Sequence, residues 1–126
     1  MKHIAEHVFP EHFEPTLETL SFTNPVFHEG INVTCRKGYK WSEQLGAIVK
    51  IAETGNEGER PGRYGHILGV LVCKLNKIPE TVLAMEHDPS CRTQEGIIKE
   101  MKRVYGDDLP EDAPTTVLFF ELESED

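Results

Sequence analysis

Two short polar stretches carry the residue types from which a binding or catalytic site could be built. The first, INVTCRKGYKW, starts at Ile31 and places three cationic side chains next to the only tryptophan of the chain. Strand alternation would aim Thr34 and Arg36 in the same direction. In a site for single-stranded nucleic acid, Arg36 and Lys40 would contact a phosphate or a base edge, and Trp41 would stack on a base. The alternative is a solvated strand end with Trp41 in the core. Because tryptophan is usually buried, we expect Trp41 in the core, whereas Arg36 fits both interpretations.

The second stretch, EHDPSCRT, starts at Glu86. Glu86, His87 and Asp88 beside Cys91 could ligate a metal, and His87 could act as a general base near neutral pH. Asp88 is also a good helix N-cap, and the open N-terminus of that helix would bind an anion with the help of Arg92. Because no pair of candidate ligands has a diagnostic spacing, we expect an anion here rather than a metal.

A glycine-rich segment, TGNEGERPGRYG, spans Thr54 to Gly65 and is expected to be a long loop. Arg63 and Tyr64 could close over a ligand from this loop, and the alternative is an ordinary mobile hairpin. Its glycines match neither the phosphate-binding loop nor the dinucleotide fingerprint, so we expect no nucleotide cofactor.

The elements that must position these residues are mostly strands. Apolar and β-branched runs predict strands over residues 31–36, 46–52, 66–75 and 116–122, and residues 16–22 form either a short strand or a helical turn. The third run is apolar enough to be buried on both faces, with Gly69 as a bulge or a point of close backbone approach.

One late helix completes the pattern. Asp88 followed by Pro89 predicts its start, with Thr93 as a competing N-cap, and Gly106 ends it. Several strands with one helix predict an α+β fold, in which a mostly antiparallel sheet of five or six strands is covered by the helix. At 126 residues the chain forms one domain, with an N-terminal arm at residues 1–22 and an acidic, frayed end at 123–126.

Charge is unevenly distributed along the chain. Residues 106–126 carry −8 and residues 1–30 carry −4 of a total of −9, which leaves +3 for the middle segment. The negative field of the whole protein repels long nucleic acids, but a local basic groove can still bind a short single-stranded piece. The acidic C-terminal block could instead bind a basic protein partner.

The remaining composition argues against several classes of protein. No stretch approaches the roughly 20 apolar residues that span a bilayer, and the start of the chain lacks a secretion signal, so we expect a cytoplasmic protein without a membrane partner. Cys35, Cys73 and Cys91 are odd in number and widely spaced, which predicts reduced thiols rather than disulfides or a zinc site.

The order of these pieces resembles the ASCH domain of the PUA-like superfamily. The resemblance covers roughly residues 27–122 and is carried by Thr34-Cys35-Arg36, by GAIVKI at 46–51, by MKRVY at 101–105 and by VLFFEL at 117–122. It implies a small β-barrel with flanking helices and a cleft at one mouth, a fold linked to the recognition of RNA and modified bases. Some small bacterial members hydrolyse the amide of N4-acetylcytidine with a Lys, a Thr and a Glu.

Only part of that catalytic pattern is present in this chain. Thr34 matches the nucleophile position, two residues before the matched arginine, but the position of the family lysine is occupied by Ile31. Lys40 could approach from the following turn. The position of the family glutamate falls near Ser90, and Glu86 could fill that role if the loop is rearranged.

These observations favour a protein that binds RNA or a modified nucleoside. The expected cleft is lined by Thr34, Arg36, Lys40 and Trp41, with further ligand contacts from Arg63, Tyr64 and Arg92. The first alternative is an amidohydrolase acting on an acylated nucleoside with Thr34, Lys40 and Glu86. The second is a protein-interaction domain that uses the acidic C-terminal block.

Overall fold

The structure, a computed structural model, describes residues 18–22, 26–53 and 60–123. Five strands form one sheet: β1 (Thr19–Phe22), β2 (Ile31–Lys37), β3 (Ile48–Glu53), β4 (Arg60–Lys74) and β5 (Pro114–Leu122). Their spatial order is β1-β3-β4-β5-β2, and every neighbouring pair is antiparallel except β1 with β3. The predicted α+β class and the mostly antiparallel sheet are confirmed.

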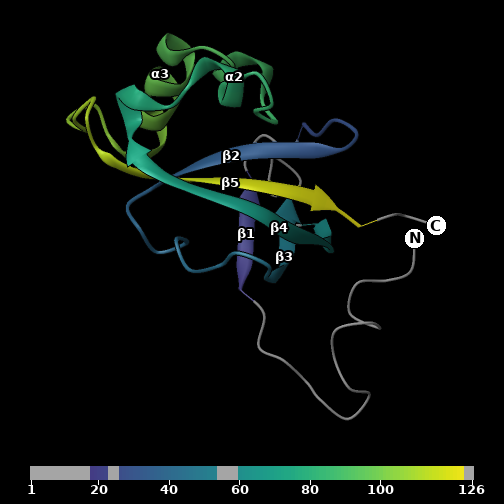
Figure 1. The fold of residues 1–126 in the computed structure, drawn as a ribbon. Coiled ribbons are helices and arrows are strands. Elements are labelled where there is room, and N and C mark those ends of the chain that lie inside the picture. Colours follow the sequence, from purple (N-terminus) through teal and green to yellow (C-terminus); the bar gives the residue numbers. More distant parts are fainter. Residues whose placement is uncertain (1–17, 23–25, 54–59, 124–126) are drawn as a thin grey trace.

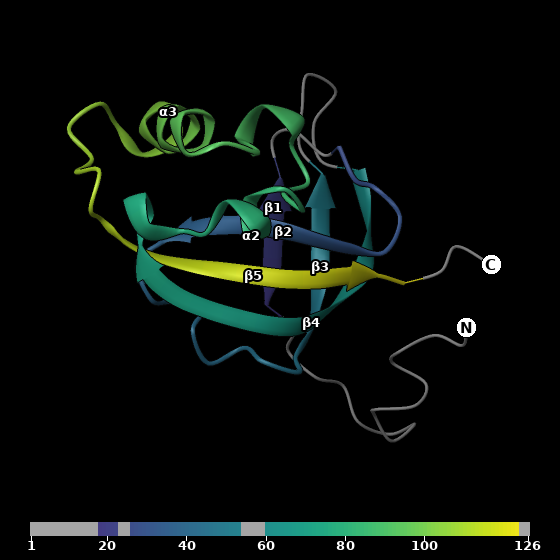
Figure 2. The ribbon, with the colours of Figure 1, turned by 45° about the horizontal axis from the view of Figure 1, so that its top comes forward.

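Within the described part of the chain, all helical turns lie in the connection between β4 and β5. They are η1 (Leu75–Lys77), α2 (Glu80–Leu83), η2 (Pro89–Cys91) and α3 (Gln94–Tyr105). Two views of the ribbon place α2 and α3 together on the side of the molecule that carries β2 (Figures 1 and 2). No helix within the described ranges is long and apolar enough to cross a membrane.

Strand β4 departs most from expectation. It already begins at Arg60, so the segment 60–65 is strand rather than loop, while residues 54–59 lie outside the described ones. The predicted burial of both faces is wrong, because Leu68 and Val72 are 42% and 45% exposed. Gly69 does mark a register shift, and a Cβ there would lie 3.1 Å from Cδ1 of Phe119. The apolar run therefore belongs to a long strand that is partly exposed and whose backbone comes close to Phe119 at Gly69.

The two candidate N-caps each serve a different element. Asp88 Oδ1 accepts a hydrogen bond from the Ser90 amide at 2.9 Å and caps η2, whereas Thr93 Oγ1 accepts from the Gly96 amide at 3.0 Å and caps α3. Helix α3 ends at Gly106 as predicted, with a φ of +114°. The short turn η2 thus fixes the segment that leads into the helix.

The hydrophobic core has two parts. An inner cluster is formed mainly by residues of β1, β3, β4 and β5, and it consists of Leu20, Phe22, Trp41, Val49, Ile51, Ile67, Leu118 and Phe120. An outer cluster joins the helical connection to the sheet, and it includes Val33, Leu75, Ile78, Leu83, Cys91, Ile97, Met101 and Val117. Trp41 is a core residue, as its size predicted.

The sheet remains open between its two end strands. The described residues of β1 and β2 do not pair with each other, an arrangement that is compatible with a PUA-like barrel. Instead, β2 pairs with the segment that follows α2. The Val33 amide donates to Met85 O at 2.9 Å, the His87 amide donates to Val33 O at 2.9 Å, and Glu86 faces Val33 in a parallel bridge. This pairing brings a distant acidic segment to the free side of β2.

Candidate functional site

A small cavity lies where the two core clusters meet, between the free sides of β1 and β2 and helix α3. Its volume is about 120 Å³. Among its lining residues, β1 contributes Phe22, and β2 contributes Thr34 and Arg36. Glu86 and His87 come from residues 85–87, the segment that pairs with Val33 and is called the bridged segment below. Two stretches that lie about fifty residues apart in the sequence therefore supply polar groups to one small cavity.

The β2 side of the cavity carries a hydroxyl and a cation. Thr34 is buried, and its Oγ1 accepts a hydrogen bond from Nε of Arg36 at 3.3 Å. Cζ of Arg36 lies 4.8 Å from the centroid of the Phe22 ring, a cation–π contact. Burial lowers the pKa of Arg36 from its usual value, although Tyr105 and Glu86 counteract this change. The guanidinium is basic enough to stay protonated, so the cavity contains a fixed positive charge.

The same cavity is also lined by a buried carboxylate. Glu86 is only 1% exposed, and its Oε1 lies 2.6 Å from Nδ1 of His87. The same oxygen accepts a longer hydrogen bond of 3.4 Å from the Asp88 amide, and Oε2 accepts from the Cys35 thiol at 3.7 Å. Because buried charges need partners, these donors explain how a carboxylate persists in this environment.

The thiols next to this carboxylate are held in their neutral form. Burial, followed by the charge of Glu86, raises the pKa of Cys35 well above its usual value. The same two causes raise the pKa of Cys91, which also lines the cavity, to about 12. All three cysteines are free, as predicted. Since the thiolate is the reactive form, neither buried thiol is suited to act as a nucleophile.

Several residues proposed from the sequence lie elsewhere. The chain leaves β2 at Gly38, whose φ is +76°, and Lys40 does not line the cavity: its Nζ lies 5.6 Å from the ring of Trp41. Trp41 itself is packed in the inner cluster. Of the predicted site residues, the structure thus brings Thr34 and Arg36 together with Glu86, but not with Lys40 or Trp41.

The residues from the glycine-rich segment and the helix start also have other surroundings. Arg63 lies over the ring of Phe27 at 5.7 Å and borders a separate hollow of about 540 Å³. The Tyr64 amide donates to Glu123 Oε1 at 3.1 Å. Arg92 donates from Nε to the backbone oxygen of Glu86 at 3.0 Å, and it therefore braces the bridged segment.

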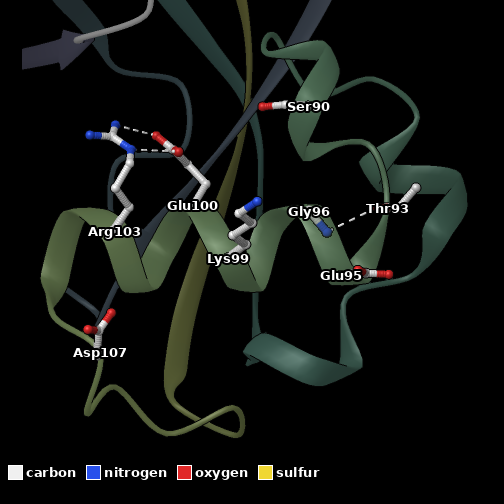
Figure 3. Close-up of a pocket in the computed structure, with 8 residues that line it drawn as sticks. All are labelled: Ser90, Thr93, Glu95, Gly96, Lys99, Glu100, Arg103 and Asp107. Atoms are coloured by element: carbon white, nitrogen blue, oxygen red, sulfur yellow. Dashed lines mark hydrogen bonds and ion pairs between the residues drawn. The ribbon is translucent and has the colours of Figure 1, made fainter.

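A larger and more open groove runs along the outer side of α3 (Figure 3). Its volume is about 650 Å³, and its charged residues include an ion pair in which Arg103 Nε donates to Glu100 Oε1 at 2.8 Å. The amide of Gly96 already donates to the Thr93 cap, as the close-up shows. No group of three or more His, Cys, Asp or Glu side chains among the described residues is placed to hold a metal ion.

Comparison with known proteins supports the fold. No protein-family model matches the chain, and no curated protein matches its sequence significantly. The structure is similar to an ASCH domain from Lactobacillus crispatus, with a TM-score of 0.53 and 16% identity over 72% of this chain and 63% of that one. It is also similar to a DUF984 protein from Enterococcus faecalis, with a TM-score of 0.53 and 17% identity over 73% of this chain and 60% of that one. The chain thus spans about three fifths of each structure, and the predicted ASCH-like fold is confirmed.

Proposed function

We propose that the cavity between β1 and β2 binds the base of a modified nucleoside, either free or within a short single-stranded RNA. The observation that carries the proposal is the pairing of hydrogen-bond donors on β2 with acceptors on the bridged segment. Arg36 offers guanidinium N–H groups, Thr34 offers a hydroxyl, and Glu86 and His87 line the same space. Bases are recognised through such alternating donor and acceptor groups on their edges.

The size and the aromatic wall of the cavity suit one base. A volume of about 120 Å³ is well below the about 300–1,000 Å³ of pockets that hold drug-sized ligands. Phe22 and His87 line it, with their ring centroids 4.8 Å apart and the rings edge to face. Aromatic side chains bind bases with little dependence on sequence, so the polar groups are left to determine which base is accepted.

The charge of the cavity favours a neutral ligand. Three carboxylates, those of Glu86, Asp88 and Glu100, line it together with the single guanidinium of Arg36. The protein as a whole carries −9. The carboxylates of the cavity and the negative charge of the whole protein would both repel a phosphate group. We therefore expect a nucleoside to bind more tightly than its 5′-monophosphate.

A thermal-shift screen tests this proposal. The probes are cytidine, N4-acetylcytidine, their 5′-monophosphates and short RNAs, with wild type, Arg36→Gln and the exposed control Arg103→Gln measured side by side. A ligand at 100 times its Kd adds about 2.7 kcal/mol to the stability of the folded state. We expect a nucleoside to raise the Tm of wild type and of Arg103→Gln but not of Arg36→Gln. Absence of any shift in wild type would overturn the proposal.

A second candidate is hydrolysis of an acylated nucleoside, favoured by the contact between Arg36 and the Thr34 hydroxyl. A guanidinium N–H directed at Oγ1 stabilises negative charge on that oxygen when it loses its proton. Thr34 Oγ1 would attack the acyl carbon, the C–N bond would break with a proton transferred to the amine, and water would then release the acid from the acylated threonine. Because Lys40 does not line the cavity, Glu86 or His87 must accept the threonine proton.

Release of cytidine from N4-acetylcytidine, followed by chromatography, tests the second candidate. Thr34→Val keeps the shape of the side chain and removes the hydroxyl, so we expect it to abolish turnover and to weaken nucleoside binding by no more than the loss of one ordinary hydrogen bond, about 1 kcal/mol. Turnover that survives this substitution would show that Thr34 is not the nucleophile.

A further inference from the structure

The contacts of the His87 ring determine which of its two nitrogens carries a hydrogen. Nδ1 lies 2.6 Å from Glu86 Oε1 and 3.1 Å from the backbone oxygen of Val33. A carboxylate and a carbonyl can only accept hydrogen bonds, so Nδ1 must carry a proton to be compatible with both. In the neutral ring, the lone pair that can accept a hydrogen bond is then on Nε2.

The position of the ring is as constrained as its protonation. The His87 amide donates to Val33 O at 2.9 Å, which holds the backbone against β2. The ring packs edge to face against Phe22, and its centroid lies 5.8 Å from that of Phe27. Turning the ring over about the Cβ–Cγ bond would put Cδ2 in the place of Nδ1, and the two acceptors would then lose their N–H donor. The side chain is 11% exposed, it lines the cavity, and none of the described residues hydrogen-bonds to Nε2.

We propose that His87 is a specificity-determining residue, which presents Nε2 to the ligand as a hydrogen-bond acceptor, and that Glu86 is the positioning residue that fixes this tautomer. Together with Arg36, which donates from β2, the cavity then selects ligands that carry an N–H donor close to a carbonyl acceptor. Secondary amides and amino-substituted pyrimidines have this pattern, and fully alkylated amines lack the donor. The inference rests on the proposed nucleoside-binding function and deepens it.

The tautomer can be tested in the protein without ligand. Protein labelled with nitrogen-15 at histidine distinguishes protonated from bare ring nitrogens in a long-range proton–nitrogen NMR spectrum. We expect His87 to be protonated at Nδ1 in wild type and in Glu86→Gln, whose amide oxygen still accepts, and to become a mixture of tautomers in Glu86→Leu. If Glu86→Leu does not fold, the wild-type spectrum still decides, because a proton on Nε2, alone or together with one on Nδ1, would overturn the proposal.

The role toward the ligand is tested with a pair of probes, N4-acetylcytidine and its N4-methylated analogue, which lacks the N–H. Wild type should bind the first at least about tenfold more tightly, the equivalent of one hydrogen bond of ordinary strength, and its Nε2 signal should move when the probe saturates the protein. His87→Phe keeps an aromatic ring without an acceptor, so it should lose this preference. A preference that persists in His87→Phe is steric and overturns the role of His87.

Failure of the underlying function would look different. If wild type binds none of the tested ligands, that is, the two probes, cytidine and the short RNAs, the nucleoside-binding proposal is overturned. The role of His87 toward the ligand is then overturned as well. If wild type binds the acetylated probe while the Nε2 signal stays unchanged, nucleoside binding stands and only the role assigned to His87 is overturned.

Discussion

Helix α3 borders two hollows that differ in size and in chemistry. The outer groove has a volume of about 650 Å³, and its Arg103 side chain is 60% exposed. The inner cavity has about 120 Å³, and its Glu86 is 1% exposed with three donors on the carboxylate. Exposed ion pairs contribute little because water screens them, whereas buried polar groups persist only where partners hold them in place. Fixed partners, not volume, therefore identify the inner cavity as the candidate site.

The largest effect expected from this difference is on stability. Glu86→Ala leaves the Asp88 amide without its acceptor, deprives the His87 ring of its shorter partner and opens space in a buried region. We expect the free energy of unfolding to fall by about 2–3 kcal/mol. Asp107→Ala, the same kind of truncation at an exposed carboxylate of the outer groove, should alter it by less than about 0.5 kcal/mol. Urea denaturation followed by circular dichroism measures both, and equal effects would contradict the contrast.

A second test concerns the junction between the two hollows, where α3 packs against η2. A Cβ on Gly96 would lie 2.0 Å from the backbone oxygen of Ser90, so Gly96→Ala must push η2 away. Replacing glycine by alanine inside a helix usually stabilises a protein by up to about 1 kcal/mol. Here we expect a net loss of about 1–2 kcal/mol, because the overpacking outweighs that gain. A rise in thermal stability would show that the contact between η2 and α3 is loose.

The pH dependence of stability offers a third test. In the folded protein the pKa of Cys91 is about 12, compared with 9.0 for an ordinary thiol. Between these values the unfolded chain has lost this proton and the folded protein still holds it, so stability falls as pH rises from 9 to 12. Burial raises the pKa of Cys35 as well, in the same direction. Cys91→Ala should fall less steeply than wild type over this range, and identical slopes would contradict the assignment.

The smallest effect is expected at the exposed ion pair of the outer groove. Arg103 and Glu100 pair on the surface of α3, where water screens the interaction. Arg103→Gln should leave the Tm unchanged within the error of a thermal melt, and it should leave nucleoside binding unchanged too. A clear loss of binding in this variant would indicate that the outer groove takes part in recognition.

Local patterns in the sequence predicted most of the fold and some of the residues that line the candidate cavity. Strand alternation correctly placed Thr34 and Arg36 on one side of β2, and capping rules identified both Asp88 and Thr93. The position of Glu86 depends instead on a backbone bridge to Val33, 53 residues earlier in the chain. No local signal encodes such a contact, and this is why the sequence alone did not place His87 in the same cavity as Thr34 and Arg36.

Turn geometry explains why some other residues of the predicted site lie elsewhere. The sequence places Lys40 and Trp41 close to Arg36, but the chain turns at Gly38 and leaves the line of β2. Trp41 then packs in the inner cluster with Leu118 and Phe120. Nearness in sequence was a poor guide here, because a positive φ at one glycine redirects the residues that follow.

The most direct test of the central claim is a backbone proton–nitrogen NMR titration of the wild-type protein with N4-acetylcytidine and with cytidine. We predict that saturating nucleoside shifts the amide signals of Thr34, Arg36 and His87 and leaves those of Lys99 and Arg103 in the outer groove unchanged. Shifts confined to the outer groove, or no shifts with either nucleoside, would contradict the assignment of the inner cavity as the binding site.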